Sequence, residues 1–151
     1  MRTSIVVLLC VLVAGCTSAV IPHYLPDTNP YSRRYDAGYE QTYAAVKEAL
    51  DDLGWVIEQE ADPLVYEQDQ NQNKSQNDVL IMSNTRQTPL FVGTRYAKLN
   101  IYIHSQDDIS DVELRYLTIN SLPFKAVTNY SNDAAAERIL DYIGEVLAET
   151  P

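Results

Sequence analysis

Apolar and polar residues alternate over two neighbouring stretches, 96–104 and 112–119, and this pattern constrains the fold more than any other feature of the chain. Successive side chains of a strand point to opposite faces, so each stretch predicts a strand with one apolar face. Residues 105–110 (SQDDIS) predict the turn between the two strands. Clean alternation is typical of a sheet covered on one side only, which favours an antiparallel arrangement.

Two amphipathic helices flank the predicted strands. Residues 37–53 carry an apolar stripe at helical spacing, with Asp36 at the N-cap position and Gly54 where a left-handed residue would end the helix. Residues 133–148 carry a second stripe, and the polar residues 131–133 offer N-cap oxygens. Both segments are therefore predicted to be helices.

The remaining segments complete the predicted fold. Residues 55–60 and 79–84 predict further strands, and 64–66 predict a short partner strand. Residues 67–78 contain no apolar side chain and predict a flexible loop, and 121–130 predict a connection. The predicted fold is α+β, a two-layer sandwich in the order α-β-β-β-β-α. Its antiparallel sheet has four to five strands and both helices lie on one face.

The first sixteen residues predict an export signal. Arg2 supplies positive charge, and residues 5–14 form an unbroken apolar run. Such a run spans about 15 Å as a helix, half of a bilayer core, so a transmembrane anchor is not expected. Residues 13–16 (VAGC) resemble the lipobox of bacterial lipoproteins, which implies signal cleavage between Gly15 and Cys16 and acylation of Cys16. The alternative is an ordinary secretory signal with an incidental cysteine.

This resemblance divides the chain into a signal peptide (1–15), a lipidated cysteine with a proline-containing tether (16–35) and a single α+β domain (36–149). The tether contains three prolines at four-residue spacing and predicts a semi-extended segment, although its apolar residues could instead dock on the domain. Thr17 and Ser18 follow the cysteine. By resemblance to sorting rules in enteric bacteria, the absence of aspartate there implies transfer to the outer membrane.

Charge and cysteine content exclude several function classes. After cleavage, the chain holds 10 basic and 21 acidic residues, a net charge of −11. Phosphates and anionic headgroups repel such a chain, so we expect no nucleic-acid partner and attribute membrane association to acyl chains. Cys10 leaves with the signal and Cys16 carries lipid, so no thiol remains for disulfides, catalysis or metal binding.

Residues suited to catalysis or metal binding are few. Asp107, Asp108 and Asp111 spell DDxxD, which binds magnesium-pyrophosphate on a helix, but here they lie in a predicted turn, where aspartates are common. The two histidines, His23 and His104, have no neighbours at the spacing of a zinc site or a nucleophile triad. We therefore expect no catalytic residue, no metal site and no cofactor.

Four residues form the candidate partner-binding face. Tyr96, Lys98, Asn100 and Tyr102 share the polar face of the strand predicted at 96–104. Because only the apolar face can meet the helices, we expect these four side chains to be exposed. Exposed tyrosines supply contact area at low entropic cost, which suits a binding surface. The alternative is that tyrosine serves only as a strand former on a half-exposed face.

Two segments carry a resemblance to known proteins. In residues 43–60 (YAAVKEALDDLGWVIEQE) a helix ends in Leu-Gly and passes directly into a strand, and residues 137–147 (ERILDYIGEVL) form the closing helix. This layout resembles a recurrent group of small bacterial outer-membrane lipoproteins of uncharacterised function. It is also similar to the helix-grip domains of the outer-membrane assembly lipoprotein BamC. No functional residue is carried over from either.

These observations lead to one expected function and two alternatives. We expect a non-enzymatic, lipid-anchored binding or scaffold module on the periplasmic side of the outer membrane. Its partner would be an envelope protein in an assembly or transport complex. The alternatives are a metal-dependent periplasmic hydrolase that uses the acidic turn, and a structural lipoprotein that contacts peptidoglycan.

Overall fold

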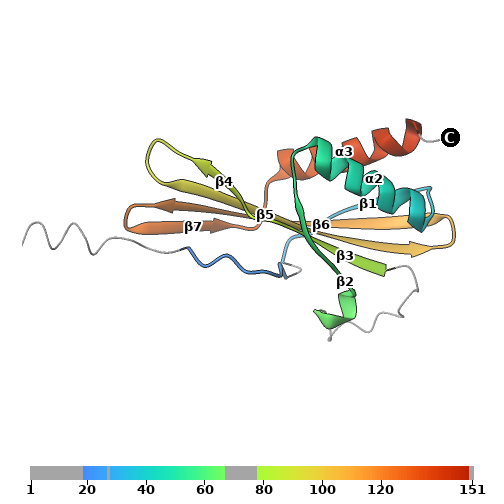
Figure 1. Ribbon diagram of the computed structural model, residues 1–151, viewed down its shortest axis with the longest axis horizontal. Coiled ribbons are helices and arrows are strands. Elements are labelled where there is room, and N and C mark those ends of the chain that lie inside the picture. The colour runs from blue at the N-terminus through green and yellow to red at the C-terminus, as the bar shows by residue number, and fades with distance from the viewer. Residues whose placement is uncertain (1–18, 27, 67–77, 150–151) are drawn as a thin grey trace, which may run out of the picture.

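The computed structural model describes residues 19–26, 28–66 and 78–149, which form a mixed α+β fold (Figure 1). In chain order the elements are β1 (Tyr31–Tyr35), α2 (Tyr39–Asp52), β2 (Ile57–Ala61), the 3-10 helix η1 (Pro63–Val65), β3 (Asp78–Ser83), β4 (Arg86–Pro89), β5 (Thr94–Gln106), β6 (Ile109–Leu122), β7 (Lys125–Asn129) and α3 (Asp133–Glu149). The predicted class, an antiparallel sheet with two helices, is confirmed.

The long strands β5 and β6 form the centre of a seven-stranded sheet. They pair continuously from Thr94 opposite Ser121 to Gln106 opposite Ile109. At the helix-covered half of the molecule the strand order is β1-β6-β5-β3-β2, whereas at the other half β4 lies beside β5 and β7 lies beside β6. All of these pairs are antiparallel. The two halves of β5 and β6 therefore have different neighbours.

The predicted count of four to five strands and the predicted order with a helix first are both wrong. β1 comes before the first helix and lies within the segment assigned to the tether, where it pairs with β6. β7 lies within the predicted connection 121–130, and residues 63–65 form a 3-10 turn rather than a strand. The strands that were missed are short: every residue of β4 and β7 is exposed and β1 buries only Tyr35, so no apolar alternation marks them.

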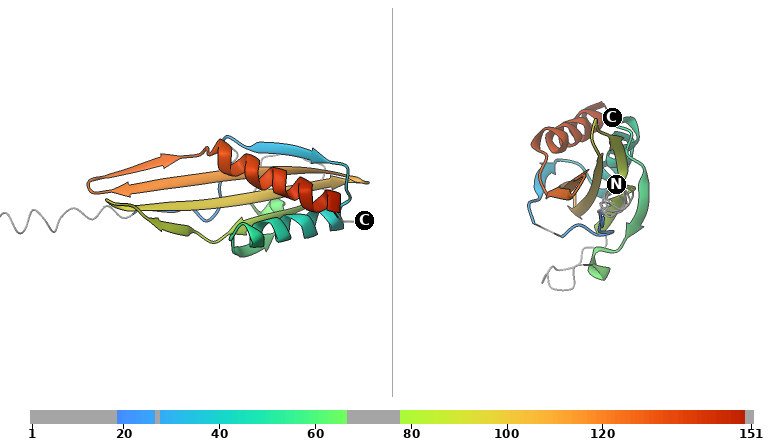
Figure 2. Two further views of the ribbon diagram at one scale, coloured as in Figure 1. Left: turned by 90° about the horizontal axis from the view of Figure 1, so that it is seen from above. Right: turned by 90° about the vertical axis from the view of Figure 1, so that its left-hand side faces the viewer.

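Both helices cover one face of the sheet, where they lie side by side (Figure 2). The core beneath them contains the apolar faces of the central strands, as the alternation predicts: Leu99, Ile101 and Ile103 from β5, and Val112, Leu114 and Tyr116 from β6. The helices contribute Val46 and Leu50 from α2 and Ile139, Leu140 and Ile143 from α3. None of these core side chains is more than a few per cent exposed.

The end of α2 matches the prediction, but its beginning does not. Gly54 has a φ of 72°, and its N–H donates to the Asp51 carbonyl while the Trp55 N–H donates to the Leu50 carbonyl. This pair of bonds is the Schellman motif, which requires a left-handed residue at Gly54. The N-cap is Gly38 rather than the predicted Asp36, so no side chain caps the start of the helix. Neither described helix is long and apolar enough to cross a bilayer.

The half of the sheet beyond the helices is a four-stranded ribbon, the distal arm (residues 84–97 and 117–130), which extends away from them (Figure 1). Its two turns lie against each other at Gly93, which has a φ of 100°. A Cβ atom on Gly93 would lie 2.0 Å from the Ser121 carbonyl oxygen. Only glycine therefore allows the β4–β5 turn to lie this close to β6.

We expect Gly93→Ala to destabilise the protein by about 2 kcal/mol or more, because the new methyl group meets backbone and the residue is left-handed. Gly144→Ala in α3 is the matched control. Its Cβ would lie 3.5 Å from the Tyr35 ring, an ordinary contact, and alanine favours helix by about 1 kcal/mol. Denaturant midpoints should therefore move in opposite directions. An unchanged midpoint for Gly93→Ala would contradict the packing of the arm.

Candidate functional site

The predicted partner-binding face is buried rather than exposed. Lys98 is 3% exposed, Asn100 is 0% exposed and Tyr102 is 6% exposed, whereas Tyr96 is half-buried. The strand alternation does place all four on the face of β5 that points away from the helices, since the intervening residues belong to the core beneath the helices. The expectation of exposure is wrong because a second layer covers this face.

This covering layer is the N-terminal segment (residues 19–26), together with the 3-10 helix η1. Leu25 is completely buried and packs with Leu117 and Ile119 of β6, and Ala19 and Ile21 pack against the same cluster. Tyr24 packs on the neighbouring cluster formed by β3 and β5 and stacks on Tyr66. The segment assigned to a tether therefore docks on the domain, the alternative that the sequence left open.

Two buried polar side chains hold the peptide groups of Leu25. The side-chain amide of Asn100, oriented so that each of its atoms meets a complementary partner, accepts a hydrogen bond from the Leu25 N–H at 3.0 Å. The Arg115 guanidinium donates to the Leu25 carbonyl at 3.3 Å and to the Tyr24 hydroxyl at 2.8 Å. Buried polar groups require such partners, so the segment satisfies the polar groups on the sheet beneath it.

An ion pair closes one edge of the covered face. Lys98 donates from Nζ to Oε2 of Glu58 at 2.9 Å, and Nδ1 of His23 lies 3.7 Å from the same oxygen. The hydrogen bond from Lys98 lowers the pKa of the Glu58 carboxyl below its ordinary value. The almost fully buried side chain of Lys98 therefore has its counter-ion, Glu58, on β2. The N-terminal segment brings the imidazole of His23 to the same carboxylate.

Asp78 joins two more residues of β5. Its carboxylate accepts from the Tyr102 hydroxyl at 3.1 Å and lies 2.7 Å from Nδ1 of His104. His104, which has no predicted partner in the sequence, is half-buried and paired with Asp78. Lys98, Asn100 and Tyr102 thus bond to the chain itself, and Tyr96 packs against the cluster around Leu25. The face is covered by the protein's own N-terminal segment.

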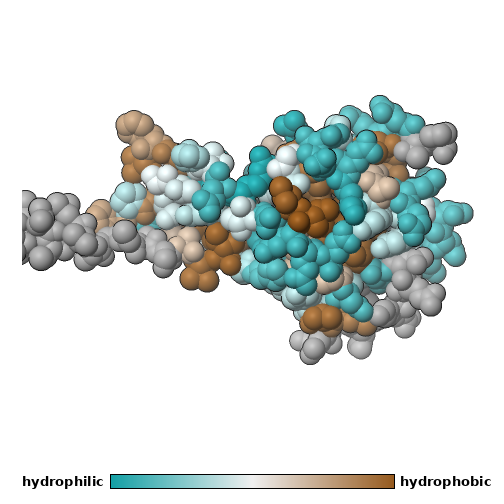
Figure 3. Space-filling model, in the orientation of Figure 1, coloured by the Kyte–Doolittle hydropathy of each residue, from teal (hydrophilic) through white to brown (hydrophobic). Residues whose placement is uncertain are grey.

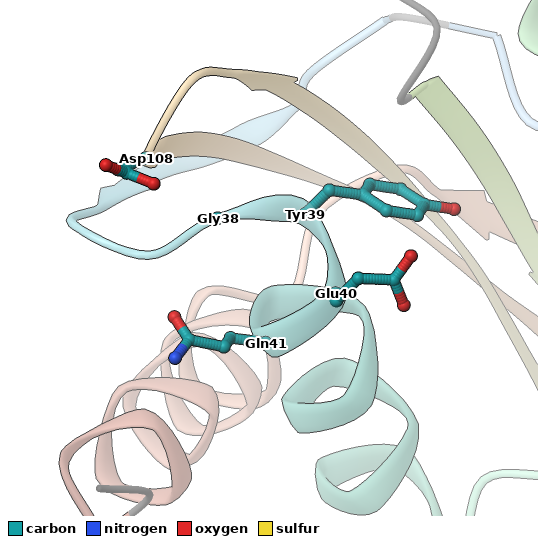
Figure 4. Close-up of a pocket in the computed structure, with 5 residues that line it drawn as sticks. All are labelled: Gly38, Tyr39, Glu40, Gln41 and Asp108. Carbon is teal, nitrogen blue, oxygen red and sulfur yellow. The ribbon is translucent and has the colours of Figure 1, made fainter.

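The acidic turn does not bring its carboxylates together. Asp107 and Asp108 form the turn between β5 and β6, whereas Asp111 lies on β6 and accepts two bonds from Arg34, which lower the pKa of the Asp111 carboxyl. A shallow hollow of about 360 Å³ lies beside this turn, and Figure 4 shows Asp108 and Glu40 pointing away from each other across it. Among the residues described, no three His, Cys, Asp or Glu side chains are grouped to hold a metal ion.

Two predicted sites lie outside the described residues. Gly15 and Cys16, the predicted cleavage and lipidation residues, precede the described range, and the loop predicted at 67–78 is described only at Asp78, which begins β3. Their assignments stay predictions from the sequence.

Comparison with known proteins finds a similarity in fold and none in sequence. The sequence matches no protein-family model, and no curated protein matches it. The fold is similar to the crystal structure of a TBP-like protein from Parabacteroides distasonis, with a TM-score of 0.44 and 10% sequence identity. That alignment covers 81% of this chain and 94% of the other.

We expect Leu25→Ala to lower the free energy of unfolding by about 2 kcal/mol or more, because the substitution leaves a cavity between the N-terminal segment and β6. Val20→Ala is the matched control: Val20 lies in the same segment but is largely exposed, so its truncation should change stability by less than about 0.5 kcal/mol. Denaturant unfolding measures both. Equal small effects would mean that the segment is a free tether.

The lowered pKa of Glu58 predicts a pH dependence. Ionised Glu58 stabilises the fold above its unfolded pKa of about 4.3, and this contribution is lost as the pH falls through the lower folded pKa. We therefore expect Glu58→Gln to lose less stability than the wild type between about pH 5 and pH 3. Glu48→Gln, at an exposed position of α2, should keep the wild-type slope. Identical slopes in all three proteins would contradict the role of the Lys98–Glu58 pair.

Proposed function

We propose that this protein is a non-enzymatic, lipid-anchored binding and scaffold module on the periplasmic side of the bacterial outer membrane, within an envelope assembly or transport complex. The observation that supports the proposal is the docking of the N-terminal segment, which begins three residues after the predicted lipid site. With Leu25 buried and both of its peptide groups bonded, the chain from Ala19 onward belongs to the folded domain. A position of this kind suits a domain that works close to its anchor.

The docked segment shortens the distance between anchor and domain. A free tether over residues 17–35 would reach about 60 Å, at about 3.1 Å per residue. Ala19 already packs on the domain, and the three peptide units from Cys16 to Ala19 span at most about 11 Å. An acylated Cys16 would therefore hold the domain at the bilayer surface in a restricted orientation, which is useful for a scaffold.

The helix layer offers a charged surface for a protein partner. The acidic residues of α2 are Glu40, Glu48, Asp51 and Asp52, and those of α3 are Asp133, Glu137, Asp141, Glu145 and Glu149. Lys47 and Arg138 are the basic residues of these helices. This layer lies on the face of the sheet opposite the N-terminal segment, and its net negative charge suits a basic surface on the partner.

We expect Cys16→Ser to leave an unprocessed precursor that incorporates no labelled fatty acid, because both the cleavage and the acylation attributed to this site depend on the cysteine. Wild-type protein expressed in the same cells is the control. Gel mobility and fatty-acid labelling report the two events separately. Normal cleavage and release of the Cys16→Ser protein would replace the lipoprotein proposal with a plain secretory signal.

The partner-binding part of the proposal is tested by in-cell photo-crosslinking. A photoreactive amino acid replaces Glu48 or Glu145 on the helix layer, and Ser32, at an exposed position of β1, serves as the matched control. We expect the helix positions to form one discrete adduct with an envelope protein, identified by mass spectrometry, and the control to form none. Absence of an adduct from both helix positions would contradict the helix layer as the binding surface.

A further inference from the structure

The two phenylalanines of the chain both lie at the end of the distal arm. Phe91 is fully exposed in the β4–β5 turn, and Phe124 is 78% exposed in the β6–β7 turn. Phenylalanine is among the residues most often buried in a soluble domain. Both phenylalanines lie on turns and are exposed, which indicates a surface that contacts an apolar partner.

The two turns form one continuous surface. Thr94 pairs with Ser121, and the close approach of Gly93 to Ser121 holds the turns together. Further exposed apolar residues surround the phenylalanines: Val92, Leu122 and Val127. Figure 3 shows hydrophobic residues at this end of the molecule, and the helix-covered part is mostly hydrophilic apart from one hydrophobic patch near its centre. We call this surface the arm tip.

Phe124 has a strained backbone conformation, although its side chain packs little against the rest of the domain. Pro123 and Phe124 are the two residues of the β6–β7 turn, and Phe124 has a φ of 69°. Glycine or asparagine is preferred at such a position, because a bulky residue there costs on the order of 1 kcal/mol. Since the ring is largely exposed, its packing offsets little of this cost, which favours a role in contact with a partner.

Charge is distributed unevenly along the long axis. None of the 21 acidic residues lies in the distal arm, whose charged side chains are Arg86, Arg95 and Lys125. The arm therefore carries a charge of +3, whereas the rest of the processed chain holds 7 basic and 21 acidic residues, a charge of −14 that would repel an anionic membrane. At the arm tip, Lys125 flanks the turn that holds Phe124, and Arg95 lies on β5 with its Nε donating to Asn120.

The N-terminal segment runs toward the arm tip. Leu25 is bonded to Arg115, near the middle of β6, whereas Ala19 and Ile21 pack in the cluster that contains Ile119. Going back along the chain therefore means moving toward the β6–β7 turn. At most about 11 Å of chain joins Ala19 to Cys16, so the lipid attachment site lies within that reach of the arm-side end of the segment.

We propose that the arm tip docks on the phospholipid bilayer that holds the acylated Cys16. The rings of Phe91 and Phe124 lie at the boundary of headgroups and acyl chains, and Arg95 and Lys125 face anionic headgroups. This inference rests on the proposed function for its anchor. The lipid keeps the tip at high local concentration near the bilayer, so a weak contact is sufficient to orient the domain.

Tryptophan fluorescence in bromolipid vesicles tests the contact. The full-length processed protein is reconstituted in vesicles of phosphatidylethanolamine and phosphatidylglycerol (about 3:1) with brominated acyl chains, which quench tryptophan only at short range. The reporters are Phe91→Trp and Phe124→Trp, read against the single natural tryptophan, Trp55, which is buried. Glu48→Trp on α2 is the matched control. Unchanged thermal midpoints verify that each variant is folded.

We expect the tip tryptophans to lose about half of their emission in brominated vesicles, since interfacial side chains lie only 5–10 Å deep, and the control to lose little. Adding Arg95→Gln and Lys125→Gln should weaken the contact by about fivefold per charge at low salt, whereas Arg138→Gln should not. Protein that floats with the vesicles but shows no quenching at either tip position would overturn the inference and leave the anchor intact.

Flotation and quenching also separate failure of the anchor from failure of the tip. If Cys16 carries no lipid and the protein does not float, the proposed function fails, and the tip is then tested with excess vesicles. Quenching under that condition supports the inference by itself, and absence of quenching overturns it. Unquenched tips in a protein that dimerises in sedimentation would assign the surface to a second copy of the chain instead.

Discussion

The pairing of β5 with β6 is the constraint on which the rest of the structure depends. Every other strand except β2 pairs with one of these two, and β2 reaches them through β3. One half of the hairpin carries the helices on one face and the N-terminal segment on the other. The other half continues beyond the helices as the distal arm. One long hairpin therefore supports a core and a projection with different surroundings.

The sequence predicted the elements whose own side chains form the core. The helices and the central strands have periodic apolar residues, and burial of those residues is what holds them in place. The short strands β1, β4 and β7 were missed because each is held largely by pairing with a longer strand; of their side chains, only Tyr35 of β1 is buried in the core. In β1, for example, Arg33 and Arg34 point to acidic partners on α3 and β6.

The exposure of the candidate partner-binding face was predicted wrongly for a related reason. Lys98 and Asn100 look like surface residues when only their own strand is considered, and their partners lie far away in the sequence. One signal for a second covering layer was present: residues 79–82 (VLIM) are continuously apolar, which is typical of a strand buried on both faces. The two stretches without acidic residues, 84–97 and 117–130, were equally visible in the sequence. Only the topology brings them to the same end of the molecule.

The bond between Arg115 and Leu25 joins positions 90 residues apart, and this separation fixes an order of folding events. The N-terminal segment is synthesised first, yet the surface that receives it does not exist until β5 and β6 have been made and have paired. Contacts this distant in sequence form late, since the intervening chain must first be ordered. The lipidation proposed at Cys16 would therefore precede docking of the segment and need no reopening of the folded domain.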